Sequence, residues 1–135
     1  MPLVRIDLIA GTEPEQVRRI ADAVQEALVS TFGIPERDRF QIITEHPASQ
    51  VIALDAGLGF ERSEGVVMIQ IFTQQGRTPE AKQQLYAAVA SGLAALGVRP
   101  EDVFIGYVEN GPEDWSFGFG RAQYVTGELA VPHAG

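Results

Sequence analysis

The sequence begins MPLVRIDL, residues 1–8, and this stretch places a strand directly at the amino terminus. Its apolar residues alternate with Arg5 and Asp7, a pattern that predicts a strand with one buried face. Pro2 follows the initiator methionine, which is normally removed before so small a residue. Pro2 would then carry a free secondary amine, a base or a nucleophile whose pKa an apolar pocket would lower. The alternative is that proline is merely a common second residue.

The composition bounds the class of protein. The chain has 135 residues, of which 45% are hydrophobic, so we expect one domain with its own core. The absence of cysteine excludes disulfides and thiol chemistry and fits a reducing compartment. A net charge of −8 argues against a nucleic-acid partner. Because no apolar run reaches about 18 residues and the first strand is not a signal peptide, we expect a cytoplasmic protein with no membrane partner.

Residues 1–45 predict a first β-α-β unit. Thr12 and Glu15 have the spacing of a capping box, Pro14 suits the first turn of a helix, and Gly33 can end it in a left-handed conformation. The helix presents one apolar stripe, formed by Val17, Ile20, Ala21, Val24, Ala27 and Leu28. A second strand over residues 40–44 would then pair in parallel with the first.

The same pattern returns over residues 66–108. A strand over residues 66–72 precedes a helix that Thr78 caps and Pro79 opens, and a strand over residues 103–108 follows it. The chain is therefore a duplicated β-α-β unit, an α+β fold whose four-stranded mixed sheet carries two helices on one face. The strands are too apolar for the other face to remain in water, so another subunit should cover it.

Two segments lie outside the repeat. Residues 46–65 link the two units, and long ordered loops of this kind often line sites. Residues 109–135 form a carboxy-terminal extension in which residues 115–121 alternate aromatic and small residues. Alternation of this kind places the aromatic rings on one side of an extended segment. They would cap the core, pack on a neighbouring subunit or line a pocket.

The sequence resembles the tautomerase superfamily and, within it, the malonate semialdehyde decarboxylase family. The resemblance rests on the proline that follows the initiator methionine, on the duplicated unit, and on several blocks of sequence. These blocks are PL (residues 2–3), GIPERDRFQI (33–42), EHP (45–47), GLGF (57–60), DWSFGFGRAQ (114–123) and TGEL (126–129). The resemblance implies a homotrimer with an amino-terminal proline in each site, acting on a small anionic oxo acid without a metal or an organic cofactor.

The resemblance also implies roles for individual residues. The family's catalytic proline, aspartate and arginine fall on Pro2, Asp38 and Arg77, and the residues that wall its pocket fall on Trp115 and Phe117. From the residues alone, other interpretations remain open. The Asp38 carboxylate could bond the backbone amides of its own turn, the Arg77 side chain could be solvated, and Trp115 could belong to the core.

The sequence departs from the family at one position. Where the family carries a second arginine, two residues before the first, this chain has Gln75 in a loop that is one residue longer. A neutral amide thus replaces one cationic contact, so that the substrate preference depends on Gln75 as well as on Arg77.

These residue types suit the decarboxylation of malonate semialdehyde to acetaldehyde and carbon dioxide. A protonated Pro2 could polarise the aldehyde oxygen or form an iminium, and either would stabilise the charge left when carbon dioxide departs. Arg77 could hold the carboxylate by two hydrogen bonds. Asp38 would favour the charged amine, and aromatic walls would exclude water.

Other functions fit the same residues. A neutral Pro2 would favour a tautomerase acting on a 2-oxo acid or enol, whereas a hydratase or dehalogenase would need a protonated Pro2 and a base that activates water. Candidate bases are Asp55, Glu109 and Glu113. A trimeric binding protein without catalysis is a further alternative. The two histidines, His46 and His133, are too far apart and too isolated to predict a metal site.

Overall fold

The computed structural model describes residues 1–131, so His133 lies outside the described residues. The principal elements are β1 (Leu3–Ile9), α1 (Pro14–Phe32), β2 (Phe40–His46), β3 (Val67–Gln74), α2 (Pro79–Ala94), β4 (Val103–Asn110) and α3 (Gln123–Thr126). Three short 3₁₀ helices accompany them: η1 (Ala48–Gln50), η2 (Pro100–Asp102) and η3 (Pro112–Asp114). None of the helices within the described residues is long and apolar enough to cross a membrane.

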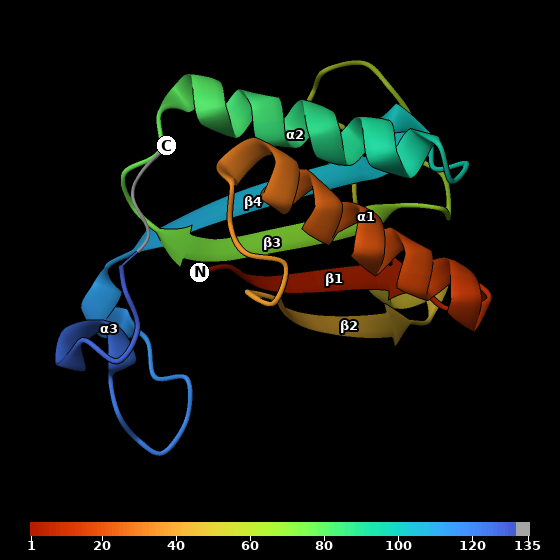
Figure 1. Cartoon of the computed structure of the whole chain (residues 1–135). Coiled ribbons are helices and arrows are strands. Elements are labelled where there is room, and N and C mark those ends of the chain that lie inside the picture. Colours follow the sequence, from red (N-terminus) through yellow and green to blue (C-terminus); the bar gives the residue numbers. More distant parts are fainter. Residues whose placement is uncertain (132–135) are drawn as a thin grey trace.

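The four strands form one mixed sheet in the order β2-β1-β3-β4. β1 and β2 are parallel, as are β3 and β4, and the two units meet where β1 and β3 run antiparallel. Both long helices lie on the same side of this sheet (Figure 1). The predicted duplicated unit, the mixed sheet and the placement of the helices are confirmed.

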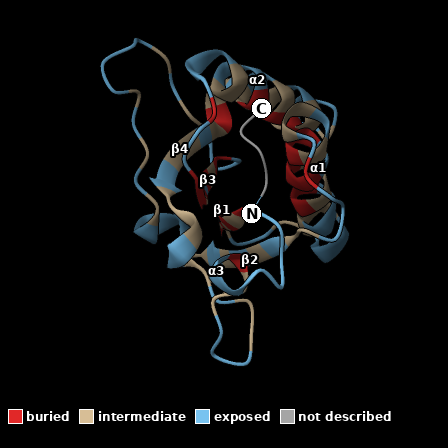
Figure 2. Cartoon of the chain, turned by 60° about the vertical axis from the view of Figure 1, so that its left-hand side comes forward, coloured by how far each residue is buried: buried red, intermediate tan, exposed pale blue. Residues whose placement is uncertain are grey.

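The core lies between the sheet and the two helices, where Figure 2 shows the buried residues. Alternate residues of the two central strands face the apolar stripes of α1 and α2, as the sequence pattern predicts. Complete burial of one large aliphatic side chain contributes about 1.5–3 kcal/mol. The most deeply buried members are Val4, Ile6, Val24, Leu28, Ile69, Ile71, Leu85, Val89 and Leu93.

The predicted cap of α1 is wrong, whereas the other predicted helix ends are confirmed. The helix begins at Pro14 after Glu13, which is extended (φ −59°, ψ 139°), and no side chain caps it. A residue before proline avoids the helical region, so the first turn cannot begin early enough for Thr12 to act as its cap. Gly33 is left-handed (φ 67°) and donates to the carbonyl of Val29, and Thr78 caps α2.

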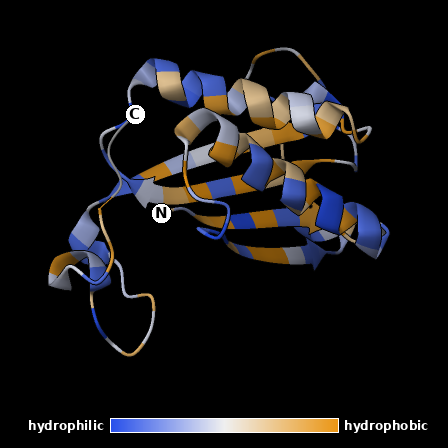
Figure 3. Ribbon diagram, in the orientation of Figure 1, coloured by the Kyte–Doolittle hydropathy of each residue, from blue (hydrophilic) through white to orange (hydrophobic). Residues whose placement is uncertain are grey.

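Neither long helix covers the second face of the sheet, where Phe117 contacts Phe40 and Arg62 contacts Phe104. This face carries large apolar side chains that are between 41% and 46% exposed, namely Phe40, Ile42, Phe104 and Val108. Figure 3 shows apolar and polar residues alternating along the strands. An apolar patch of this kind marks an interaction surface, so the expectation of a covering subunit stays a prediction.

The carboxy-terminal segment leaves the end of the sheet and forms a separate arm (Figure 1). Trp115 and Phe117 stack in parallel with their ring centres 6.0 Å apart, so these two rings do share one side. The expectation fails at Phe119, which is 90% exposed. Phe119 has a positive φ of 60° between Gly118 and Gly120, and a bridge from Gly118 to Arg121 closes this turn. The turn reverses the chain and sends the Phe119 ring away from the other two.

Candidate active site at the amino terminus

The amino terminus is buried beside the carboxylate of Asp38. The α-amino nitrogen of Met1 lies 3.7 Å from Asp38 Oδ2, and the two side chains are 5% and 9% exposed. Because Met1 is part of this chain, its primary amine stands in for the secondary amine that Pro2 would carry once Met1 is removed. Pro2 is itself buried at the start of β1.

The turn after α1 holds Asp38 in place. The backbone N–H of Asp38 donates to the carbonyl of Pro35 at 3.0 Å. The buried amide of Gln25, on α1, donates to the carbonyls of Glu36 and Asp38, both at 3.3 Å. Asp38 Oδ1 is buried without a hydrogen-bond partner in the described part of the chain. The carboxylate therefore faces the amine and does not bond the amides of its own turn.

Burial acts on both partners of this pair. It lowers the pKa of the terminal amine below its usual value, and this effect exceeds the rise caused by Asp38; the nearby charge of Arg77 lowers the amine pKa further. Burial also raises the pKa of Asp38, which the amine and Arg77 partly offset. Each shift favours the neutral form, so a small change in surroundings moves the proton between a charged pair and a neutral one.

The guanidinium of Arg77 lies in the interior, and the alternative of a solvated side chain is wrong. Arg77 is 7% exposed, and its central carbon lies 4.2 Å from the centre of the Phe32 ring. Nη1 donates to Thr73 Oγ1 at 3.3 Å and to the carbonyl of Gln74 at 3.5 Å. Nε has no partner among the described residues. An unpaired, buried N–H is costly, and a carboxylate would satisfy it.

Tyr124, on α3, belongs to the same region, although the sequence pattern did not indicate it. Its ring is buried and meets the Phe117 ring edge-on, with centres 5.1 Å apart. Burial raises the pKa of Tyr124 to about 12; the Asp38 charge also raises it, and Arg77 lowers it. The phenol is thus protonated at neutral pH and available as a hydrogen-bond donor close to both charges.

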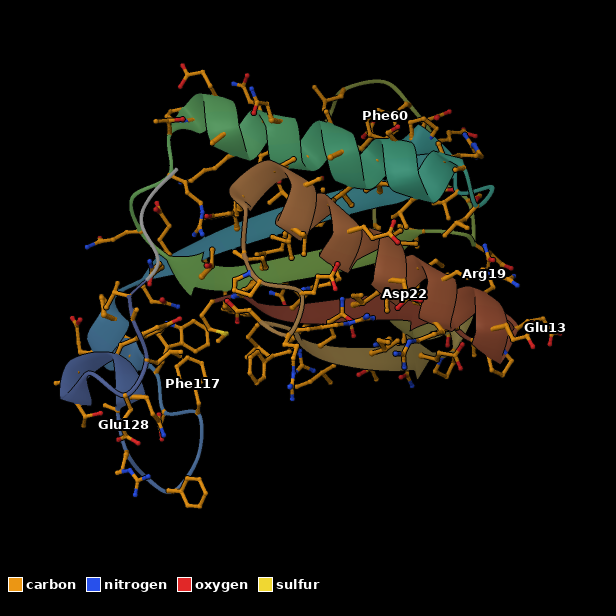
Figure 4. All side chains as sticks on the ribbon, viewed as in Figure 1. Glu13, Arg19, Asp22, Phe60, Phe117 and Glu128 are labelled. Atoms are coloured by element: carbon orange, nitrogen blue, oxygen red, sulfur yellow. The ribbon has the colours of Figure 1, made fainter. Side chains whose placement is uncertain are left out.

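A cavity of about 340 Å³ opens beside the amino terminus. Its lining is mostly apolar, with Asp38 and Arg37 as the charged members. Phe117 reaches toward it from the carboxy-terminal arm (Figure 4), and its ring centre lies 5.9 Å from that of Phe40. The complete lining is Met1, Pro35, Arg37, Asp38, Phe40, Phe117, Tyr124, Leu129 and Ala130.

Of the six expected site residues, Asp38 and Phe117 line this cavity, whereas Pro2, Gln75, Arg77 and Trp115 do not. Trp115 stacks on the Phe117 ring, and its indole Nε1 donates to Asn110 Oδ1 at 2.8 Å. Gln75 is exposed just beyond the end of β3, where its backbone N–H donates to the carbonyl of Asn110. β3 runs two residues further than the sequence pattern indicated, and this extension buries Thr73 and Gln74 and leaves Gln75 outside.

Known proteins match this chain along its whole length. A family model described as tautomerase enzyme matches residues 38–118, and a second model of the same description matches residues 2–61. The chain belongs to the tautomerase superfamily. The predicted resemblance to this superfamily is confirmed.

The chain is 39% identical over 130 residues to probable tautomerase YrdN of Bacillus subtilis (strain 168), with 96% of this chain and 100% of that protein covered. It is 61% identical to the FG41 malonate semialdehyde decarboxylase inhibited by 3-bromopropiolate, with a TM-score of 0.94 and 96% and 99% of the two chains covered. A second malonate semialdehyde decarboxylase is 36% identical, with a TM-score of 0.90 and 95% and 99% covered. A fused 4-OT, solved as a symmetric trimer, shares the fold at 23% identity and a TM-score of 0.76, with 93% and 98% covered.

The three candidate water-activating bases do not line the cavity beside the amino terminus. The Asp55 carboxylate accepts the backbone N–H groups of Gly57, Gly59 and Phe60, which lower its pKa, so that it orders the link between the units. Glu109 pairs with Lys82 at 3.0 Å. Glu113 is exposed on η3. The link borders a separate cavity, lined in part by Asp7, His46 and Ile52.

Proposed function

We propose that this protein decarboxylates malonate semialdehyde, or a closely related 3-oxo acid, through the amino group of Pro2. The observation that carries the proposal is the buried terminal amine 3.7 Å from the Asp38 carboxylate, within the field of a buried arginine. The 61% identity to a malonate semialdehyde decarboxylase supports it. A carboxy-lyase reaction of this kind requires only a donor for the oxo group and a site for the carboxylate.

Two groups supply donors to the substrate. Arg77 offers its unpaired Nε–H to the carboxylate in a buried place, where a charge-assisted bond is strong. The Tyr124 phenol, protonated because its pKa is about 12, lies in the cavity lining and would donate a second hydrogen bond. Together they replace the pair of arginines expected from the family, which the exposed Gln75 does not supply.

The Pro2 amine stabilises the negative charge that develops on the oxo oxygen when carbon dioxide leaves. Its N–H bonds the aldehyde oxygen, and the bond between the carboxylate carbon and the α-carbon then breaks. The electron pair forms a carbon–carbon double bond, and the carbonyl pair moves to oxygen, which takes the proton from Pro2. The enol becomes acetaldehyde with a proton from solvent, and the amine regains its own. One preorganised donor of this type contributes about 3–4 kcal/mol to the lowering of the barrier.

Asp38 and the apolar walls favour this reaction. The carboxylate raises the pKa of the amine and partly offsets the effect of burial, so it favours the protonated form that decarboxylation requires. Phe40 and Phe117 keep water from the developing charge, and the electrostatic contacts are stronger in the dry cavity.

We also infer that the active form is a homotrimer. The exposed apolar face of the sheet requires cover, and a protein of the same fold is a symmetric trimer. Light scattering should give about three times the chain mass of 14.6 kDa. A stable monomer at micromolar concentration would exclude this assembly.

The test is acetaldehyde release from malonate semialdehyde by protein whose intact mass shows that Met1 has been removed. Pro2→Ala should lose most activity, because a primary amine on a flexible residue replaces the fixed secondary amine. Pro47→Ala, which changes an exposed proline of the link, is the matched control and should be unaffected. Full activity in protein that retains Met1 would contradict the proposal, since Pro2 would then be an amide without basicity.

A tautomerase acting on 2-oxo acids or their enols is the second candidate, and one observation favours it. Burial lowers the pKa of the terminal amine, and a neutral amine is a general base. The pH dependence of kcat/KM separates the candidates. Tautomerisation should accelerate as pH rises through the amine pKa, whereas decarboxylation should slow.

A further inference from the structure

We infer that the cavity beside the amino terminus binds an apolar tail on the substrate, so that the preferred class is 3-oxoalkanoates whose chain continues beyond the oxo carbon. This inference rests on the proposed function and assigns its substrate class. Malonate semialdehyde has no group beyond its oxo carbon and would leave the apolar part of the cavity to water.

Met1 shows the path that such a tail would take. Its carbonyl carbon is bonded to the Pro2 nitrogen, whose N–H is proposed to bond the oxo oxygen of the substrate in the Met1-free protein. The methionine is 4% exposed and lines the cavity with Phe40, Phe117 and Leu129. A group attached to, or held against, the Pro2 nitrogen therefore leads into the apolar space. Removal of Met1 both frees the amine and empties the place of an unbranched apolar side chain.

The size of the cavity exceeds the need of a three-carbon acid. About 340 Å³ remains even while Met1 is in place. Roughly 10–15 Å³ of such space is enough to admit one water molecule, so the cavity has room for apolar groups beyond those of a three-carbon acid. The space vacated by Met1 adds to the excess.

Most of the cavity wall is apolar, which suits a tail, and Arg37 and Asp38 are the charged residues of the lining. The rings of Phe40, Phe117 and Tyr124 form a continuous series, with centres 5.9 and 5.1 Å apart. Leu129 completes the wall and is 40% exposed, as is expected of a surface that a ligand would cover. The carboxylate of the substrate would stay with Arg77, and the tail would extend along the rings.

Binding of unreactive saturated carboxylates tests the inference without catalysis. The chain has one tryptophan, and Trp115 stacks on Phe117, so its fluorescence reports occupancy of the cavity. With Met1-free protein, the Kd should fall about fourfold per methylene from propanoate to hexanoate, the equivalent of about 0.8 kcal/mol for each group. A Kd that is independent of chain length would overturn the inference, and a neighbouring protomer that fills the cavity would produce that result.

Two matched variants locate the tail. Ala130→Phe adds a ring to the cavity lining and should weaken hexanoate binding at least tenfold while leaving propanoate unchanged. Val125→Phe adds the same ring at a position on α3 that is 64% exposed and outside the lining, and should change neither. Equal loss of both acids in Ala130→Phe would mean that the tail lies elsewhere.

Kinetics then separate this inference from the proposed function. The kcat/KM for 3-oxohexanoate should exceed that for malonate semialdehyde by at least tenfold. If malonate semialdehyde is the better substrate and Kd does not depend on tail length, the tail site is refuted and the decarboxylase stands. If tails strengthen binding and no 3-oxo acid is decarboxylated, the proposed function is refuted and the tail site stands.

Discussion

The two β-α-β units place an aspartate at the same position, and the two carboxylates are in opposite states. Each unit has a glycine after its helix, Gly33 in the first and Gly97 in the second. Asp38 and Asp102 each lie five residues after that glycine. Asp102 is 1% exposed and satisfied at both oxygens, because Ser63 donates from its backbone N–H at 2.7 Å and from its hydroxyl at 2.5 Å. Within residues 1–131, Asp38 has one buried oxygen without a hydrogen-bond partner, and its carboxylate faces an amine.

The surroundings of the two carboxylates follow from what precedes the adjacent strand. β1 begins at the chain terminus, so Asp38 meets a terminal amine, whereas β3 follows the link, which supplies Ser63 to Asp102. The cavity beside Asp102 is also smaller, at about 170 Å³ against about 340 Å³. The fold thus places a carboxylate with two hydrogen bonds at one end of the sheet and, at the other, the carboxylate that we propose to be catalytic.

The largest expected effect on kcat/KM comes from neutralising Asp38. Asp38→Asn keeps the shape and removes the charge that raises the amine pKa, so the amine should lose its proton at a lower pH. We expect kcat/KM for decarboxylation to fall by about 10²- to 10⁴-fold at neutral pH, with the upper limb of the pH profile displaced to lower pH. Asp102→Asn should leave both quantities unchanged. If the pH profile of Asp38→Asn were identical to that of wild type, Asp38 would have only a structural role in its turn.

Arg77 sharpens the same contrast, because the matching place before α1 holds the neutral Thr12, which lines the smaller cavity. Arg77→Ala should cost about 2–5 kcal/mol in kcat/KM if its contact to the carboxylate is desolvated. Gln75→Ala is the neighbouring control and should cost less than about 1 kcal/mol, since Gln75 is exposed. Steady-state acetaldehyde formation measures both. Wild-type kcat/KM in Arg77→Ala would place the carboxylate elsewhere.

The satisfied carboxylate should affect folding and not catalysis. Asp102→Ala removes the acceptor for both hydrogen bonds from Ser63 and leaves a cavity beneath the link. We expect the free energy of unfolding to fall by about 1–3 kcal/mol, measured by urea denaturation, with kcat unchanged per folded molecule. Loss of kcat without loss of stability would show that the two ends of the sheet are not functionally distinct.

The sequence predicted the regular part of this fold and only some of the site. Strict alternation in β1 and helical spacing in α1 and α2 report local periodicity, and those elements are confirmed. Tyr124 enters the site through the arm that packs beside the amino terminus, a tertiary contact that no spacing encodes. Gln75 was expected to contact substrate, but it is exposed because β3 ends at Gln74. The end of a strand is poorly defined by the local sequence pattern.

The smallest expected effect is the contribution of Asp38 to the pH dependence of stability. Burial holds the pKa of Asp38 above its ordinary value of 3.8, so the native state binds this proton more tightly than the unfolded chain. As pH rises from 3.8 through the native pKa, the native state must charge a buried group, and its stability relative to the unfolded state falls. Below that window, wild type and Asp38→Asn should be equally stable.

Above the window the variant should be the more stable protein, although it is the less active one. Urea unfolding of both proteins at a series of pH values from acid to neutral gives the difference in unfolding free energy. That difference should be near zero at the acid end and should grow in favour of Asp38→Asn as the wild-type carboxyl ionises. A difference of the opposite sign would mean that pairing with the amine outweighs burial and that the native pKa of Asp38 is depressed. Asp38 and Asp102 would then both stabilise the folded state, and only their effects on catalysis would distinguish them.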